Sequence, residues 1–310
     1  MRSLSFAILL AFTGSLAQSV SAQQLDEPDL IQSFPVGPRP FYLAFDGANI
    51  WVTNDEDGTV TKLRASDGAP QGIFAVGDFP EFITFDGANI WVANTLSNDL
   101  TKLRASDGAL LGTFAVGNHP DGLAWDGANI WVANYFDFTI SKLRGSDGRL
   151  LGTFPVGAYP EPVVFDGTAI WVGNTEYDNS VMKLASDGTV LAKIPVGDYP
   201  IALVFDGIKV WVSNYYDGTV TAIRASDEKV QGTFPVGNGP YASGSAFDGT
   251  NIWVNAVSDN KVRTLRASNG TYRQTFTVGQ SPIGLVYDGT SIWVANWGSN
   301  TVSKITRSSP

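Results

Sequence analysis

Few side chains in this 310-residue sequence have the types and spacing that catalysis requires. His119 is the only histidine, and there is no cysteine. Asp121 lies two residues after His119, but a lone histidine lacks the usual orienting partners of a catalytic base. A metal centre or a catalytic triad would need a second histidine or a cysteine in addition. We therefore predict no catalytic residue, no metal ion and no cofactor, and we favour a protein without enzymatic activity.

Aromatic and acidic side chains with irregular positions are better suited to binding than to catalysis. Aromatic faces stack on sugar rings or apolar side chains and also attract cations, and neighbouring carboxylates reinforce that attraction. A neutral glycan or a basic peptide therefore fits them better than an acidic ligand does. The candidate ligand-binding residues are Phe41, Phe79, Glu81, His119, Asp121, Tyr159, Glu161, Tyr199, Tyr215, Tyr216, Tyr241 and Trp297. The predicted partner is a small molecule, a glycan, or a peptide or protein.

A repeated segment positions these candidates. It reads Asp-Gly-Ala-Asn-Ile-Trp-Val-Ala-Asn at residues 126–134, and versions of it begin at Asp46, Asp86, Asp126, Asp166, Asp206, Asp248 and Asp288. The period is 40 residues, except for one interval of 42 residues, and seven of the nine tryptophans occupy the same position in it. A regular period of this length indicates an array of supersecondary units.

One repeat contains four segments with the character of strands. Residues 122–125 are apolar, residues 129–133 are β-branched and aromatic, and residues 139–144 alternate between polar and apolar. Residues 150–157 follow an Asp-Gly turn, and Pro155 suits the edge of a sheet. Four antiparallel strands repeated seven times predict an all-β fold, a seven-bladed β-propeller.

The two ends of the repeat array predict how the ring closes. The last repeat ends with a third strand at residues 301–305, and no fourth strand follows it. Residues 30–37 match a fourth strand and precede the first full repeat. We therefore expect the N-terminal strand to complete the last blade, which removes exposed strand edges.

The loops separate a constant face from a variable face. The turns between strands one and two, and between strands three and four, are nearly the same in every repeat. The other two sets of loops, such as residues 118–121 and 135–137, differ from blade to blade. Residues that break a repeat are free to serve a binding site, so we place the site on the variable face.

Several repeated residues have a structural interpretation. The seven aspartates of the repeated segment are expected to stabilise their Asp-Gly turns, and the seven tryptophans to pack between blades. Lys62 and Arg64, with equivalent pairs in the next two repeats, share a strand face that we expect to be solvated. Two extra residues within residues 241–247 indicate either a bulge that widens the channel mouth or a tolerated insertion.

These motifs resemble those of the YVTN and NHL-type β-propeller repeat families. The Trp-Val-Ala-Asn core, the Thr-Val-x-Lys-Leu strand and the Pro-Val-Gly-x-x-Pro loop carry the likeness, from residue 30 to the C-terminus. The streptogramin B lyases are seven-bladed relatives of this kind. The resemblance to them implies a lyase that uses two histidines, an acidic residue and a divalent metal, whereas this chain has one histidine.

The N-terminal segment and the overall charge bear on location and partners. Residues 1–22 read as a signal peptide cleaved after Ala22, so residues 23–310 form a single domain that is secreted or periplasmic. The net charge of −10 argues against nucleic acid and anionic membranes as partners, and no membrane span is evident. We expect a monomeric binding scaffold. The alternatives are a lyase or hydrolase on the same face and a purely structural module of the cell envelope or surface.

Overall fold

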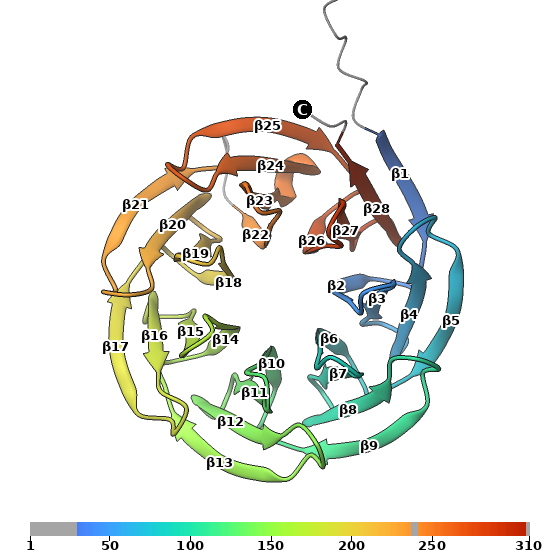
Figure 1. Ribbon diagram of the computed structural model, residues 1–310, viewed down its shortest axis with the longest axis horizontal. Helices are drawn as coiled ribbons and strands as arrows, with labels where there is room; N and C mark the ends of the chain where they lie inside the picture. The colour runs from blue at the N-terminus through green and yellow to red at the C-terminus, as the bar shows by residue number, and fades with distance from the viewer. Residues whose placement is uncertain (1–29, 237–240, 308–310) are drawn as a thin grey trace, which may run out of the picture.

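The computed structural model of the protein describes residues 30–236 and 241–307. Seven four-stranded sheets stand around a central channel like the blades of a propeller (Figure 1). The all-β seven-bladed fold is therefore confirmed. The predicted signal peptide, residues 1–22, lies outside the described residues.

Each blade runs from an inner strand beside the channel to an outer strand at the rim (Figure 1). The inner strands are β2 (Pro40–Phe45), β6 (Pro80–Phe85), β10 (Pro120–Trp125), β14 (Pro160–Phe165), β18 (Pro200–Phe205), β22 (Ala242–Phe247) and β26 (Pro282–Tyr287). The second strands are β3 (Asn49–Asn54), β7 (Asn89–Asn94), β11 (Asn129–Asn134), β15 (Ile170–Asn174), β19 (Lys209–Asn214), β23 (Asn251–Ala256) and β27 (Ser291–Asn296). The third strands are β4 (Thr59–Arg64), β8 (Asp99–Arg104), β12 (Thr139–Arg144), β16 (Ser180–Leu184), β20 (Thr219–Arg224), β24 (Lys261–Arg266) and β28 (Thr301–Thr306). The outer strands are β5 (Pro70–Ala75), β9 (Leu110–Ala115), β13 (Leu150–Pro155), β17 (Val190–Pro195), β21 (Val230–Pro235), β25 (Tyr272–Thr277) and β1 (Leu30–Pro35).

The N-terminal strand closes the ring as expected. Strand β1 pairs antiparallel with β28, from Leu30 opposite Thr306 to Pro35 opposite Thr301. The ring of Phe34 on β1 lies 5.5 Å from that of Trp293 on β27. The first and last strands thus share one sheet and one part of the core.

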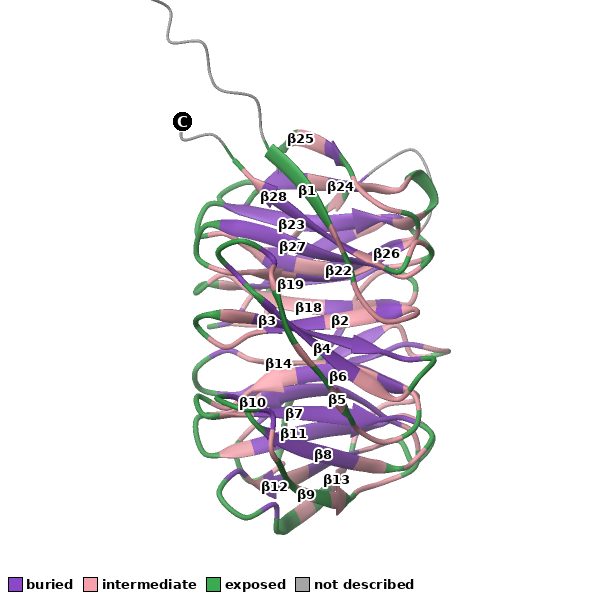
Figure 2. Cartoon of the chain, turned by 90° about the vertical axis from the view of Figure 1, so that its right-hand side faces the viewer, coloured by how far each residue is buried: buried purple, intermediate pink, exposed green. Residues whose placement is uncertain are grey.

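The second and third strands are mostly buried, whereas the outer strands β1, β5 and β9 are largely exposed (Figure 2). Apolar clusters between neighbouring sheets hold the blades together. Trp51 is fully buried and packs with Ile83, Ile90 and Val92 of the next blade. The equivalent tryptophan of every blade is buried in the same way, so the predicted packing between blades is confirmed. Gly108 shows how tight this packing is, because its φ is +76° and an added Cβ would overlap the ring of Phe74.

The expectation that the lysines of the third strands are solvated is wrong. Lys62 is only 6% exposed instead of lying on a solvated face. Its Nζ lies 4.8 Å from the ring centre of Trp51 and donates a hydrogen bond of 2.7 Å to the carbonyl of Ala105 in the next blade. The aromatic face and the carbonyl compensate the desolvated charge, so the lysine links adjacent blades. Arg64 alone is exposed, in an ion pair with Asp67.

A bulge, one of the two interpretations of the insertion in the sixth blade, occurs in every blade and therefore does not explain the two extra residues. Each inner strand carries one register irregularity against the second strand, for example between Pro120 and Leu123. The two extra residues precede β22, and residues 237–240 lie outside the described part. In the described ranges one short 3₁₀ helix, η1 (Val257–Asp259), follows β23. No helix in those ranges is long and apolar enough to cross a membrane.

Candidate functional site at the mouth of the channel

The face that bears the loops before the inner strands and after the second strands is called the mouth face here. The opposite face, with the Asp-Gly turns, is the turn face. The residue immediately before each inner strand has a positive φ, between 50° and 86°. These residues are Arg39, Phe79, His119, Tyr159, Tyr199, Tyr241 and Ser281.

A hydrogen bond between the two loops holds each of these left-handed residues. The carbonyl of His119 accepts a bond of 2.9 Å from the N–H of Tyr135, which follows the second strand of the blade. The same bond joins Tyr199 to Tyr215 and Ser281 to Trp297. Since left-handed backbone is unfavourable for residues other than glycine, its recurrence means that the loops impose it. The mouth therefore presents its side chains from fixed backbone positions.

Two predicted acidic residues and the histidine meet on the second and third blades. Glu81 and Asp121 occupy the second position of β6 and β10, and their carboxyl groups are hydrogen bonded to each other. Nδ1 of His119 lies 3.4 Å from Oδ2 of Asp121, and the hydroxyl of Thr95 donates to Glu81 over 3.2 Å. His119 and Asp121, two residues apart in the sequence, therefore lie side by side.

Burial changes the protonation of this group. Burial, followed by the charge of Asp121, raises the pKa of Glu81 to about 8. Asp121 is 3% exposed, and burial raises the pKa of its carboxyl as well, against the effect of the hydrogen bond with Glu81. Burial lowers the pKa of His119, against the effect of the nearby Glu81 charge. The carboxyl groups thus retain protons near neutral pH, while the imidazole tends to be neutral.

Glu161, on β14, is the third acidic residue and has a different environment. Glu161 is 9% exposed. Its carboxylate oxygens are not among the fully buried side-chain atoms that lack a partner in the described ranges, so they keep some contact with solvent. Burial, followed by the charges of Asp121, Glu81 and Glu176, raises its pKa well above the ordinary value. A buried carboxylate beside other acidic groups is unfavourable, so Glu161 requires either a proton or a cation.

Four tyrosines lie within electrostatic reach of Glu161. They are Tyr42, Tyr135, Tyr199 and Tyr215, and the pKa of each phenol is raised first of all by burial. The charge of Glu161 raises all four further. The hydroxyl of Tyr135 donates a hydrogen bond of 3.2 Å to Oε1 of Glu176. Glu161 is thus surrounded by aromatic residues from the first, third and fifth blades.

The remaining predicted aromatic residues form three groups instead of one continuous ring. The ring of Tyr159 contacts those of Tyr135, Phe136, Phe138 and Tyr177, with centroid distances from 4.9 to 6.4 Å. The second group joins Tyr199, Tyr215, Tyr216 and Tyr241 at 4.7 to 6.3 Å. The first group belongs to the third and fourth blades, and the second to the fifth and sixth.

The third group contains a cation of the protein itself. The guanidinium of Arg39 lies 4.5 Å from the ring centre of Trp297 and 5.2 Å from that of Phe79. Its Nε is 3.1 Å from Oδ1 of Asp55, whose Oδ2 accepts a hydrogen bond from Trp297. Phe41 lies apart from this group, since it packs with Tyr42 and Phe82 against the second and third blades. One part of the mouth therefore already holds a cation between aromatic rings and a carboxylate.

Several contributors to these groups were not among the candidates from the sequence. Tyr135 stands in the same repeat position as Tyr215 and Trp297, and Glu176 in that of Tyr216, so an alignment by position would have selected both. Arg39 likewise shares the position of Phe79. Tyr42 has no such signal, because only the fold brings it near Glu161.

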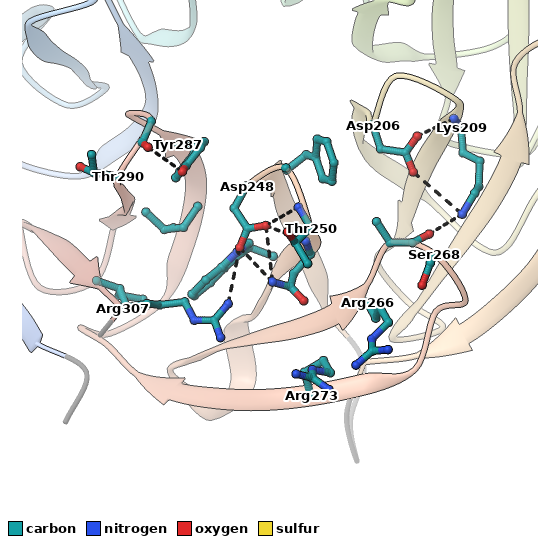
Figure 3. A pocket seen from close by; sticks show the side chains of 18 of the residues that line it. Asp206, Lys209, Asp248, Thr250, Arg266, Ser268, Arg273, Tyr287, Thr290 and Arg307 are labelled. Atoms are coloured by element: carbon teal, nitrogen blue, oxygen red, sulfur yellow. Dashed lines mark hydrogen bonds and ion pairs between the residues drawn. The ribbon is translucent and has the colours of Figure 1, made fainter. Parts of the chain in front are cut away.

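The described residues contain no group of three or more histidine, cysteine, aspartate or glutamate side chains arranged to hold a metal ion. A cavity of about 1170 Å³ lies on the turn face, separate from the predicted site (Figure 3). It is bordered by Asp206, Asp248, Arg266 and Arg307 from the fifth to seventh blades. The mouth can bind through aromatic faces and carboxyl groups and can exchange protons at Glu81, Asp121 and His119.

Solved structures of other proteins share this architecture. A chain of Kuenenia stuttgartiensis hydrazine synthase is similar with a TM-score of 0.78 and 20% identity, covering 87% of this chain and 96% of that one. A streptogramin B lyase has a TM-score of 0.76 and 18% identity, covering 90% and 98%. A catalytically inactive virginiamycin B lyase from Staphylococcus aureus, with quinupristin, has a TM-score of 0.78 and 16% identity, covering 90% and 99%.

These similarities concern the fold alone. At such low identity, propellers with unrelated activities superpose equally well. Neither the comparison with protein-family models nor that with curated proteins gives a match. The resemblance to the YVTN and NHL repeats stays a prediction from the sequence motifs.

Proposed function

We propose that this protein is a secreted or periplasmic binding protein that takes up the ammonium group of a small molecule or peptide at the mouth face. The predicted basic peptide falls within this class of ligand, and an amino sugar would fall within it too. The ligand's ammonium group would lie against Glu161, with the aromatic groups of the mouth around it. The export of the protein rests on residues 1–22.

The observation that carries this proposal is the buried carboxyl group of Glu161. A carboxylate of a residue that is only 9% exposed, and that lies near the acidic groups of Asp121, Glu81 and Glu176, is destabilised unless it is neutral or paired with a cation. Binding proteins hold such groups when the ligand supplies the partner. An ammonium ion does so, because it provides three donors and the opposite charge.

The tyrosines around Glu161 suit the same ligand. Aromatic faces attract cations, and a cation surrounded by several rings gains more once it is desolvated. Arg39 between Trp297 and Phe79 is an example within the same mouth. An anion at this position would instead meet Glu81, Asp121 and Glu161 together. These carboxyl groups, whether protonated or ionised, offer no positive charge to an anion, so they select against acidic ligands.

Isothermal titration of residues 23–310 with ammonium compounds tests the proposal. The probes are ethanolamine, spermidine and lysine methyl ester, and the matched neutral and anionic probes are glucose and citrate. We expect the Glu161→Gln variant to bind the ammonium probes at least about tenfold more weakly than the native protein. The control is Glu56→Gln, which removes an exposed carboxylate from the same face and should leave affinity unchanged.

Two results would contradict the proposal. One is an equal loss of affinity in both variants, which would mean a general effect of negative charge. The other is binding of glucose or citrate at the mouth in preference to all ammonium probes. A protein that binds no probe at about 10 mM would favour the alternative of a purely structural module.

A second candidate function is acid–base catalysis of the lyase or hydrolase class. It is favoured by one observation, the contact of His119 with Asp121 beside the protonated Glu81. A neutral imidazole accepts a proton, and a carboxyl group with a pKa near 8 donates one at neutral pH. Loss of a measured lyase or hydrolase activity in His119→Ala, with ligand affinity retained, would support it. An unchanged activity would exclude this pair as its source.

A further inference from the structure

An arginine on the turn face lacks the carboxylate that its counterparts have. At the end of the third strand, Arg64, Arg104, Arg144 and Arg224 each lie 2.9 to 3.4 Å from an aspartate three residues later. In the sixth blade the arginine is Arg266, and the residue three positions later is Asn269. In the described part of the chain, Arg266 forms no ion pair.

Asn269 preserves the turn while it removes the charge. Its Oδ1 accepts a hydrogen bond of 3.1 Å from the N–H of Thr271. Oδ1 of Asp67 accepts the equivalent bond of 3.0 Å from Ala69 in the first blade. Asn269 thus keeps the oxygen that stabilises the turn and lacks only the carboxylate oxygen that would bind the arginine. The conformation of the turn therefore does not explain the loss of the ion pair.

A second arginine lies beside the first. Arg273 on β25 stands where the fifth blade has Gln231, and Arg266 stands where it has Arg224. Nη2 of Arg224 donates a hydrogen bond of 3.0 Å to Oε1 of Gln231, so side chains at these two positions reach each other. Arg266 and Arg273 are both exposed, and within the described ranges neither has a carboxylate partner. Two adjacent guanidinium groups repel each other unless an anion lies between them.

Both arginines border the cavity of about 1170 Å³ on the turn face (Figure 3). The cavity lies between two blades that no third-strand lysine links. On β24, Thr264 lies opposite Trp253, where Lys62 lies opposite Trp51 in the first blade. Without that lysine, the space between the sixth and seventh blades stays open, and Trp253 forms part of its wall.

The other charged groups of the cavity are already engaged. Nζ of Lys209 donates a hydrogen bond to the carbonyl of Ala267 and lies 4.8 Å from the ring centre of Trp211. Arg307 lies 3.8 Å from Asp248, whose carboxylate also accepts hydrogen bonds from its own turn. Arg266 and Arg273 are therefore the cations of this cavity that are free to bind a ligand.

We propose that this cavity is a second binding site, for a small anion recognised through a phosphate or carboxylate group by Arg266 and Arg273. A guanidinium group binds such oxyanions through two parallel hydrogen bonds. Lining residues with hydroxyl groups, such as Tyr287 and Thr290, supply further polar contacts for the rest of the ligand. The site is independent of the mouth face, and its ligand has the opposite charge.

Titration of residues 23–310 with inorganic pyrophosphate and with citrate, at constant ionic strength, tests this inference. We expect saturable binding of at least one probe, and the stronger of the two identifies the oxyanion group. The decisive variant is Asn269→Asp, because it restores the ion pair of the other blades and keeps both arginines. It should weaken binding at least about fivefold, as should the double variant Arg266→Gln/Arg273→Gln.

Arg64→Gln is the matched control, since it removes an arginine from the same position of the first blade. It should bind the probes as the native protein does. Three results would overturn the inference: no binding of either probe at about 10 mM, native affinity in Asn269→Asp, or an equal loss in Arg64→Gln. Glu161→Gln should not affect this site, so its outcome is independent of the test at the mouth.

Discussion

The indole Nε1 of Trp131 donates a hydrogen bond of 2.8 Å to Oδ2 of Asp126, five residues earlier in the chain. The other carboxylate oxygen of Asp126 accepts bonds of 2.9 and 2.7 Å from the N–H groups of Ala128 and Asn129. Burial alone would raise the pKa of Asp126, but these bonds lower it. One side chain therefore joins the turn to the tryptophan of the core.

Substitution of this aspartate should destabilise the protein. In Asp126→Asn the charge that the indole and backbone donors surround is lost, and we expect a loss of about 1–3 kcal/mol in the free energy of unfolding. Asp107→Asn removes an exposed aspartate that pairs with Arg104, and it should leave the stability nearly unchanged. Urea denaturation of both variants measures the difference. Equal effects would mean that Asp126 does not anchor the core.

The acidic cluster predicts an unusual dependence of stability on pH. The pKa of Glu81 is about 8 in the folded protein, against an ordinary value of 4.5, and those of Asp121 and Glu161 are raised too. A raised folded-state pKa means that the folded protein binds more protons than the unfolded chain. The stabilisation of the fold by this additional proton binding is fully present below pH 4.5 and is lost as the pH rises toward 8. We expect the Tm to fall by at least about 3 °C between pH 5.5 and pH 8.

Calorimetry of Glu81→Gln/Asp121→Asn provides the comparison. The lowered pKa of His119 acts in the opposite sense, because a histidine with a depressed pKa stabilises the fold as the pH rises. The double variant removes the carboxyl contribution and keeps the histidine, so its Tm should fall less than that of the native protein. Glu56→Gln should behave as the native protein does. A native Tm that rises throughout this interval would contradict the assigned protonation.

Removal of the N-terminal strand should open the ring. Deletion of residues 23–37 takes away β1 and exposes the edge of β28, from Thr301 to Thr306. We expect the Tm to fall by about 10 °C or more, with aggregation through the free edge. Deletion of residues 23–29 alone keeps β1 and should leave the Tm unchanged. If the longer deletion melts like the full domain, β1 does not contribute to closure.

The sequence predicted the ring because each blade repeats the same local pattern. An Asp-Gly turn, a buried tryptophan and a third strand recur every 40 residues, so one repeat describes all of them. Closure followed from the unpaired first and last strands. The burial of Lys62 did not follow, because strand alternation places it with Arg64, whereas its partners are Trp51 and a carbonyl of the next blade.

The sequence predicted which face of the propeller carries the candidate site, but it did not predict which side chains on that face contact one another. The repeat assigns Glu81, Asp121 and Glu161 to one position of three blades, but the channel geometry decides how close their carboxyl groups lie. Trp297 and Asp55 are hydrogen bonded although 242 residues separate them. Such contacts form only when the ring closes, and the 40-residue repeat of the sequence does not indicate them.

The aromatic groups of the mouth should contribute unequally to ligand affinity. Tyr199→Ala, Tyr216→Ala and Trp297→Ala should each weaken the binding of an ammonium ligand, by about 2 kcal/mol for a central contact. Tyr272→Ala is a matched control, because this exposed tyrosine lies on the outer strand β25. Fluorescence or calorimetric titration measures the affinities. A pattern in which Tyr272→Ala and Asp107→Asn impair binding, while the mouth variants do not, would place the site elsewhere.

The protons released on binding test the central claim most directly. If an ammonium group pairs with Glu161, the carboxyl must lose its proton, since its pKa is raised in the free protein. Titration with ethanolamine at pH 7 in two buffers of different ionisation enthalpy gives the number of protons released. The account predicts a net release by the native protein, reduced or absent in Glu161→Gln. No release, or an uptake of protons by the native protein, would contradict it.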